Sequence, residues 1–589
     1  MSLQAVVHSA HPHAIFNGAA VVLSLAALTS TPAFWPLVLT ITTAHVYLTI
    51  IHRRTQLAYR LFLFWLSISI GASCSNFSSA IDALSTAGMS LIVLFGLAAL
   101  QSAIALLAIL IDVRVSSHIA HPWAQLLFFP ALWSTAWAAV AHLSPLGRIL
   151  MWSPATGAPA YAWLAPLAGP LATDWTAAAA AAVLSRLAGA WLMGPAQDAD
   201  DDAQPGPLIA ELDIASPPAA NAKPARPRHV LTLTGVLLAL AAPSFFAAPP
   251  LPVSSAVTTR VQVGCVLPSV YDKHKPDDAP LERYIAASAA LANRADVLVW
   301  PESAVTFHSA TERDAAFAAV RARVPGPAVG VSFEEPVPAA EGGRAGMRRN
   351  GFALVDHAGV ALTYYKQHLV PVAESFALAP GSTPPALHAL PLAHPKAIPP
   401  TEWSPLPDHT RPVPVTALIC LDAAHPSALL SLDSRPALLL APARTWAGGV
   451  GGAMWAQARA RAAEVGAGVV WCDGGAGGLA GVAPPAEGVR GEAEAGFEYV
   501  QRGAGSFVVS VPVAWPFHDA RTLYARAGAW LLVVPWAVLG AGWATDAVRA
   551  QRGARGVLAG LQRGIGGAGA LVVAWRKRRG AGEEQPLLQ

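Results

Sequence analysis

Three short segments in the second half of the chain carry residue types that could do nucleophilic chemistry. The segment DVLVWPESAV places Glu302 directly after an apolar run, YYKQHLVPVAESF contains Lys366, and VPVTALICLDAAHP places Cys420 at the end of another apolar run. A cysteine sulfur attacks a carbonyl carbon once its proton has been removed. A carboxylate can take that proton and return it later, and a lysine can hold a positive charge beside the developing oxyanion. Together these residues would suit catalysis through a thioester.

Each of the three residues also has an ordinary structural explanation when it is considered alone. Glu302 could be a surface acid in a loop, and Lys366 could lay its stem on apolar surface and pair with a surface acid. Cys420 could be a buried cysteine that acts as a small hydrophobic side chain. The hypothesis of a catalytic site therefore depends on the three segments together.

The spacing of the four cysteines bears on metal binding and on disulfides. They are Cys74, Cys265, Cys420 and Cys472. None has the C-x-x-C spacing of a zinc site, so we expect neither a metal nor a disulfide framework. Cys420 should lie at a tight strand-to-helix turn. We expect a helix to begin near His425 and Pro426. Its N-terminus, together with a nearby cation, would favour the thiolate.

The elements around these segments follow an α/β pattern between about residues 256 and 518. Runs rich in valine, leucine and alanine predict strands at 261–268, 296–301, 327–333, 351–359, 413–420, 437–443, 468–474 and 505–512. Helical patterns cover 281–293, 312–324 and 454–465. Alternation of this kind predicts a layered α/β domain, in which catalytic side chains lie at strand ends.

The rest of the chain is too apolar for an ordinary soluble protein. Only 13% of its 589 residues are charged, whereas soluble domains have about 25%. Apolar segments close to the ~20 residues of a spanning helix lie at about 14–30, 34–51, 57–74, 89–111, 124–141, 161–192, 230–247 and 527–544. One such run alone could be a buried core helix. The succession predicts a transmembrane domain over residues 1–255, with about seven helices, and a C-terminal transmembrane helix over residues 519–548.

Positive charges predict how the chain is oriented. Arginine and lysine follow the second and fourth apolar segments, precede the seventh, and form the basic tail at 549–589. Because such charges mark the cytoplasmic side, the α/β domain should lie on the non-cytoplasmic side of a bacterial inner membrane or a eukaryotic endomembrane. The acidic, proline-rich stretch at 197–227 should be disordered. The net charge of +3, without a basic stripe, argues against nucleic acid as a partner.

Taken together, the segments resemble the nitrilase (carbon–nitrogen hydrolase) superfamily, which uses a Glu-Lys-Cys triad in this chain order. YYKQHLVPVAESF is similar to the Y-x-K-x-H-L-V-P-F-G-E segment of the apolipoprotein N-acyltransferases, its membrane-bound branch. RRNGFALVDHAG resembles an asparagine-containing strand of that branch, and TLYARAGAW resembles its T-x-Y-x-R-x-G-x-W segment. The resemblance covers nearly the whole chain. It implies a nitrilase-type four-layer αββα sandwich at 256–518, beside a multi-span helical membrane domain.

The resemblance also implies roles for residues beyond the triad. Glu374 matches an additional loop glutamate that would support Lys366 or the substrate. Asp422 stands where the branch usually carries glutamate, and Asn350 lies on the asparagine-containing strand. Trp446 could line an acyl pocket or could simply be a packing aromatic.

Two segments depart from the pattern of that branch. Where the branch usually reads N-D-A-W-F-G, this chain reads ARTWAG at 443–448, and T-N-N-G-I-S becomes CDGGAGG at 472–478. These departures put the substrate in doubt rather than the triad.

The function that the resemblance implies is acyl transfer without a cofactor. A phospholipid would donate a fatty acyl chain to Cys420, and an amine such as a lipoprotein N-terminus would accept it. The alternative is a membrane-tethered amidase or nitrilase that uses water as the acceptor. A third hypothesis is a scaffold or transporter-like protein with an inactive domain. The intact triad argues against that third hypothesis. No acidic residue is expected deep in the helices in a way that suggests an ion path, because the nearest, Asp174 and Asp82, look like loop or interface residues.

Overall fold

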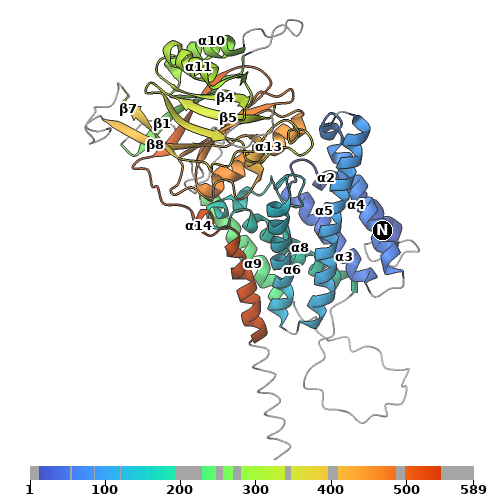
Figure 1. The fold of residues 1–589 in the computed structure, drawn as a ribbon. Coiled ribbons are helices and arrows are strands. Elements are labelled where there is room, and N and C mark those ends of the chain that lie inside the picture. The colour runs from blue at the N-terminus through green and yellow to red at the C-terminus, as the bar shows by residue number, and fades with distance from the viewer. Residues whose placement is uncertain are drawn as a thin grey trace, which may run out of the picture.

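The computed structural model shows a bundle of helices with a β-sandwich above it (Figure 1). It describes residues 12–544, except for 53–55, 85, 120, 156, 194–227, 247–255, 269–279, 339–345, 396–402, 404–408 and 486–497. The stretch at 197–227 and the basic tail at 549–589 therefore lie outside the described residues.

A helix lies at each of the eight apolar segments. The bundle contains α2 (Pro12–Ala27), α3 (Phe34–Ile51), α4 (Leu57–Ala80), α5 (Ala87–Val115), α6 (Pro122–Leu143), α8 (Pro170–Met193) and α9 (Arg228–Ala241). The last helical segment runs over Leu523–Ala544 and begins with α14 (Leu523–Ala527). Among the described residues, six helices are long and apolar enough to cross a membrane, whereas α2 is a shorter apolar helix. Large apolar side chains such as Ile92, which is 74% exposed, cover their outer faces.

The segment expected as one long helix at 161–192 is broken near its start. A 3₁₀ turn, η2 (Pro159–Leu164), and α7 (Ala165–Ala168) precede α8. Gly169 has a φ of 57°, and Pro170 begins α8 because proline suits the first turn of a helix. A Cβ on Gly169 would lie 2.6 Å from the ring of Tyr524, so the break also makes room for the start of the C-terminal helix.

Two acids are buried among the helices, and one of them, Asp174, was wrongly expected to be a loop or interface residue. Asp112 follows the expected end of its segment by one residue, is buried in α5, and lies 2.7 Å from His45 Nε2 of α3. Asp174 of α8 is fully buried and pairs with Arg148 at 3.1 Å. Both acids have partners, which is how charged groups persist among packed helices.

The sandwich consists of two sheets. The first has the order β13-β1-β2-β4-β5-β6, with β3 on β4. Its strands are β1 (Thr258–Cys265), β2 (Val297–Val299), β3 (Val305–Thr306), β4 (Ala328–Pro336), β5 (Arg348–Val355), β6 (Val360–Tyr365) and β13 (Phe507–Ala514). The second has the order β12-β11-β10-β9-β8-β7. Its strands are β7 (His388–Ala393), β8 (Thr410–Ala417), β9 (Leu438–Ala443), β10 (Gly468–Asp473), β11 (Leu479–Ala483) and β12 (Tyr499–Arg502).

Helices cover the outer faces of both sheets, which gives the four layers that the resemblance implied. Apolar side chains of α10 (Pro280–Leu291) and α11 (Ala310–Arg323) pack against the first sheet. The helix α13 (Gly448–Val465) packs against the second sheet and also contacts the bundle (Figure 1). The part of the second sheet that packs against α13 therefore lies close to the helical bundle.

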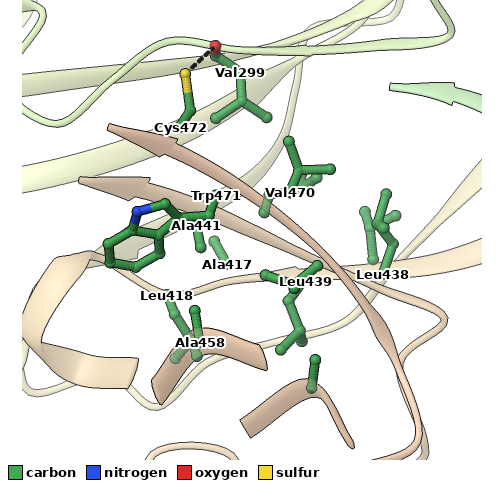
Figure 2. Close-up of a cluster of buried hydrophobic side chains, with 14 of the residues drawn as sticks. Val299, Ala417, Leu418, Leu438, Leu439, Ala441, Ala458, Val470, Trp471 and Cys472 are labelled. Carbon is green, nitrogen blue, oxygen red and sulfur yellow. Dashed lines mark hydrogen bonds between the residues drawn. The ribbon is translucent and has the colours of Figure 1, made fainter. Parts of the chain in front are cut away.

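The inner strands of the second sheet are buried on both faces. Every residue of β9 and β10 is buried, and these two strands run parallel. Figure 2 shows Leu438, Leu439 and Val470 packed in this core. Continuous apolar runs are typical of parallel strands covered on both sides. The carboxyl ends of these strands are therefore held rigidly.

A disulfide joins the two sheets, so the expectation of no disulfide was wrong. It links Cys265 at the end of β1 to Cys472 of β10, with 5.4 Å between the Cα atoms. Both cysteines are fully buried, and Cys472 Sγ lies 3.2 Å from the backbone oxygen of Val299 (Figure 2). The two cysteines are 207 residues apart. Short-range spacing rules cannot detect such a pair, because only the packing of the two sheets brings it together.

Removing this disulfide should lower stability without exposing a reactive thiol. We expect the double variant Cys265→Ala/Cys472→Ala to have a free energy of unfolding about 2–4 kcal/mol lower than wild type, because the cross-link restricts the unfolded chain. Thermal unfolding of the purified protein in detergent, compared with a Cys74→Ala variant as the matched control, measures the effect. An unchanged melting temperature in the double variant would contradict it.

Candidate active site

The three residues of the expected triad meet at one edge of the sandwich. Glu302 follows β2 and Lys366 follows β6, and both strands belong to the first sheet. Cys420 follows β8 of the second sheet. The site is therefore assembled across the two sheets, at strand ends where α/β folds place their chemistry.

Lys366 lies at the centre of the site. Its Nζ donates hydrogen bonds of 2.7 Å to Glu302 Oε1 and of 2.7 Å to Glu374 Oε1. The Glu302 carboxylate also accepts a 2.7 Å bond from Asn350 Nδ2 and a bond from Cys420. Glu302, Lys366, Asn350 and Cys420 are all buried. The structure thus brings together five of the seven residues expected at the site.

Burial and the neighbouring charges set the protonation of the triad. Burial raises the pKa of the Glu302 carboxyl, although the Lys366 ammonium opposes this shift. Burial and the charge of Glu302 raise the pKa of the Cys420 thiol well above its usual value. Burial alone would lower the pKa of Lys366, but the negative charge of Glu302 is the largest of the interactions that outweigh burial and raise that pKa. Lys366 therefore stays charged, and Cys420 must pass its proton to Glu302 as it attacks.

The backbone turns sharply at Cys420. Its φ is 46°, in the left-handed region that non-glycine residues rarely adopt. Such strain is found where a side chain must be held in a functional position. The expected tight turn after the strand is present, but the expected helix near His425 is not. A 3₁₀ helix, η6 (Cys420–Ala424), follows at once.

Help for the thiolate therefore comes from two groups rather than from a helix N-terminus. The Lys366 ammonium lowers the pKa of the Cys420 thiol, and so does a hydrogen bond from the backbone N–H of Arg444. Arg444 lies directly after β9. Sequence reasoning missed this donor, since a backbone N–H gives no signal in residue type.

Glu374 holds the loop over Lys366. Its Oε1 accepts from Lys366, while its Oε2 accepts a 2.8 Å bond from the backbone N–H of Val370. Its side chain is 23% exposed, compared with 0% for Lys366. Glu374 thus contacts both Lys366 and the backbone of the segment that follows it.

Asp422 joins the segments that carry the triad. It is fully buried, and its Oδ2 accepts a 2.8 Å bond from the hydroxyl of Tyr364. Its Oδ1 lies 2.8 Å from the backbone N of His368 and 2.9 Å from Nδ1 of the same residue. The carboxylate also accepts from the backbone N–H of Ile419 at 3.2 Å. Asp422 therefore ties the lysine segment to the cysteine turn.

The ring of His425 stacks on that of His368, with centroids 3.6 Å apart. Burial, together with the neighbouring His368, lowers the pKa of His425 to about 4.

Between pH about 6.5 and 4 the unfolded chain binds a proton at His425 that the folded protein does not. Stability should therefore fall as the pH drops through this window. The melting temperature of a His425→Gln variant should fall less between about pH 7 and pH 5 than that of wild type. An equal fall in the two proteins would contradict this prediction.

Trp446 lies apart from the triad, at the contact with the helical bundle. It is 40% exposed, and its Nε1 donates a 3.1 Å bond to the backbone oxygen of Ser79 at the end of α4. The loop after β9 thus reaches from Cys420 to the bundle. Among the described residues, no group of three His, Cys, Asp or Glu residues is arranged to hold a metal ion.

Comparisons with known proteins find similarity only among solved structures. No family model matches the sequence, and no curated protein matches it. The NitN amidase from Neterenkonia sp. AN1 is 20% identical, with a TM-score of 0.32, over 47% of this chain and 99% of that one. A carbon-nitrogen hydrolase from Helicobacter pylori G27 is 13% identical, with a TM-score of 0.31, over 43% of this chain and 89% of that one. A CN-hydrolase superfamily protein from Xanthomonas campestris is 17% identical, with a TM-score of 0.29, over 48% of this chain and 97% of that one.

Proposed function

We propose that the chain is a membrane-bound acyltransferase of the nitrilase superfamily. It would move a fatty acyl group from a phospholipid, through a thioester on Cys420, to an amine such as the N-terminus of a lipoprotein. The observation that carries the proposal is the buried cluster in which Glu302 accepts from both Lys366 and Cys420. A charged lysine beside a cysteine and its base suits a reaction that develops an oxyanion.

In the first step, the ester carbon of the phospholipid is attacked. The Cys420 thiol gives its proton to Glu302 while the sulfur bonds to the carbonyl carbon, and the negative charge on oxygen faces Lys366. When the tetrahedral intermediate collapses, the ester C–O bond breaks. Glu302 then donates its proton to the departing lysophospholipid alcohol, which leaves an acyl thioester on Cys420.

In the second step, the thioester is resolved by an amine. The amine nitrogen attacks the thioester carbon and passes a proton to Glu302, and Lys366 again faces the oxyanion. Collapse breaks the C–S bond, and Glu302 returns the proton to the sulfur. An amide is formed and the Cys420 thiol is restored, so the cycle needs no cofactor.

The attachment of the site to the helical bundle supports a lipid substrate. The backbone N–H of Arg148, in the connection after α6, donates a 3.0 Å bond to the carbonyl oxygen of Ala424, four residues beyond Cys420. Together with the Trp446–Ser79 bond, this contact sets the cysteine turn directly on the bundle. A phospholipid beside these apolar helices would therefore lie next to the part of the sandwich that carries Cys420.

The buried disulfide supports a catalytic domain on the non-cytoplasmic side. Disulfides persist in oxidising compartments such as the periplasm and the endoplasmic reticulum lumen, and they are rare in the cytosol. The Cys265–Cys472 bond lies in the sandwich. This agrees with the side that the positive charges of the chain predict.

Transfer can be separated from hydrolysis with one assay. Purified protein in detergent is incubated with a phospholipid labelled in its acyl chain and with a diacylglyceryl-cysteine peptide whose α-amine is free. We expect label in the peptide as an amide, which hydroxylamine does not cleave. Release of free labelled fatty acid alone would overturn acyl transfer and favour a hydrolase. An N-acetylated copy of the peptide serves as the matched control, because it offers no amine.

A further inference from the structure

The two segments that depart from the acyltransferase pattern lie against each other beside Cys420. A Cβ on Gly475 would lie 1.7 Å from the backbone oxygen of Thr445. A Cβ on Gly477 would lie 2.3 Å from the backbone nitrogen of Gly448. The glycines of 472–478 thus let its backbone touch the backbone of 443–448. The departures form one contact rather than two unrelated changes.

Asp473 is the polar centre of this contact. It is 2% exposed. Its Oδ1 accepts bonds from the backbone N–H groups of Thr445 at 2.9 Å and Gly475 at 3.0 Å. Its Oδ2 accepts from Thr445 Oγ1 at 2.6 Å and from the backbone N–H of Leu479 at 3.3 Å. A buried carboxylate with four donors fixes the groups around it, because an unmade bond here would be costly.

The peptide held by Asp473 is the one that reaches the reacting sulfur. Arg444 directly precedes Thr445, and hydrogen bonding by its backbone N–H lowers the pKa of the Cys420 thiol. One residue earlier, the carbonyl oxygen of Ala443 accepts from the backbone N–H of Glu302 at 3.3 Å. The short segment 443–445 therefore contacts the nucleophile and the base on one side and Asp473 on the other.

The disulfide anchors Asp473 in turn. Asp473 directly follows Cys472, whose sulfur is bonded to Cys265 in the facing sheet. The next residue is also closely packed, since a Cβ on Gly474 would lie 2.7 Å from Pro301, directly before Glu302. The strand end that carries Asp473 is thus fixed relative to the strand end that carries the base.

We propose that Asp473 is a positioning residue that holds the backbone N–H of Arg444 against Cys420 Sγ. This N–H stabilises the thiolate as the proton leaves. Under the proposed function, on which this second role rests, it also remains beside the oxyanion of the thioester-forming step. A donor fixed in advance needs no rearrangement during the reaction, which is why such groups contribute strongly to catalysis.

The test measures the reactivity of the Cys420 thiol, which requires no acyl substrate. The full chain is used in a Cys74→Ser background, because Cys74 is the other free cysteine and is exposed. The rate of alkylation by iodoacetamide is followed from about pH 6 to pH 10. We expect Asp473→Ala to slow alkylation about tenfold near neutral pH and to move the profile to higher pH. Thr445→Val, which removes one of the four bonds, should give a smaller shift in the same direction.

Two further variants separate positioning from a general loss of structure. Asp473→Asn keeps an oxygen that can accept from Thr445 and Gly475, so it should recover most of the alkylation rate. Asp433→Ala removes an exposed carboxylate from the same domain and should leave the profile unchanged. An alkylation profile in Asp473→Ala that matches wild type would overturn the proposal. If Asp473→Ala does not fold, an unchanged profile in Thr445→Val overturns it.

The alkylation test of Asp473 can succeed or fail independently of the acyl-transfer assay. A slowed alkylation in Asp473→Ala together with no transfer by wild type would remove the proposed function and leave the positioning role. If wild type does transfer acyl groups, Asp473→Ala should lower kcat and leave KM within about twofold, because the N–H acts on the reacting sulfur rather than on substrate binding.

Discussion

Replacing Cys420 by alanine should abolish the acyl-enzyme. Wild-type protein incubated with phospholipid should gain the mass of one fatty acyl chain, and Cys420→Ala should gain none. Transfer to the amine should fall by at least about 10³-fold, because losing a nucleophile removes the whole covalent route. Intact-protein mass spectrometry and the labelled transfer assay measure the two effects.

Two variants make this result specific to the sulfur at this position. Cys74→Ala removes the exposed free cysteine and should keep both the adduct and the activity. Cys420→Ser keeps a nucleophilic atom but should be nearly inactive, because a hydroxyl gives up its proton far less readily than a thiol. An adduct that persists in Cys420→Ala, or that is lost in Cys74→Ala, would contradict a thioester on Cys420.

The residues of the candidate site could be predicted from the sequence because they are marked by type and by order. Glu302, Lys366 and Cys420 each follow an apolar run, and strand ends are where α/β domains gather polar side chains. The sequence could not show that Glu302 would accept from both of the other two. That contact depends on two sheets whose packing is set by residues throughout the domain.

The groups that were missed share one physical reason. The Arg444 donor is a backbone N–H, so its position depends on the loop rather than on the arginine side chain. The Cys265–Cys472 pair is separated by 207 residues, and Asp473 was noted only as part of an altered loop. Each acts through contacts between segments that are distant in sequence, which local spacing and composition do not encode.

The elements themselves were easier to predict where they are long or fully buried. The strand runs at 437–443 and 468–474 coincide with β9 and β10, whose residues are all buried. The strands that were missed are short or lie toward sheet edges: β3, β6, β7, β11 and β12. A proline interrupts β7 at Pro391, and edge strands tolerate such residues. The sequence of β7 therefore lacks the continuous apolar run of the inner strands.

Lys366→Met should lose both stability and activity, and adding Glu302→Gln should restore stability alone. The Lys366 ammonium lies 2.7 Å from Glu302 in a fully buried site. Removing one member of a buried ion pair costs about 3–5 kcal/mol, because the other charge is left uncompensated. Replacing Glu302 by neutral glutamine removes most of that charge, so the double variant should melt closer to wild type. Neither variant should transfer acyl groups, since Lys366→Met lacks the cation and the double variant lacks both the cation and the base.

The pH dependence provides a second check on the same pair. Without Lys366, burial should raise the pKa of the Glu302 carboxyl still further, so the folded protein should bind a proton that the unfolded chain releases. The stability deficit of Lys366→Met should therefore be larger at about pH 8 than at about pH 5. The double variant has no carboxyl at position 302, so its deficit should vary less with pH. Full activity in Lys366→Met, or a double variant no more stable than Lys366→Met, would show that the pair does not act as a buried ion pair at the reacting centre.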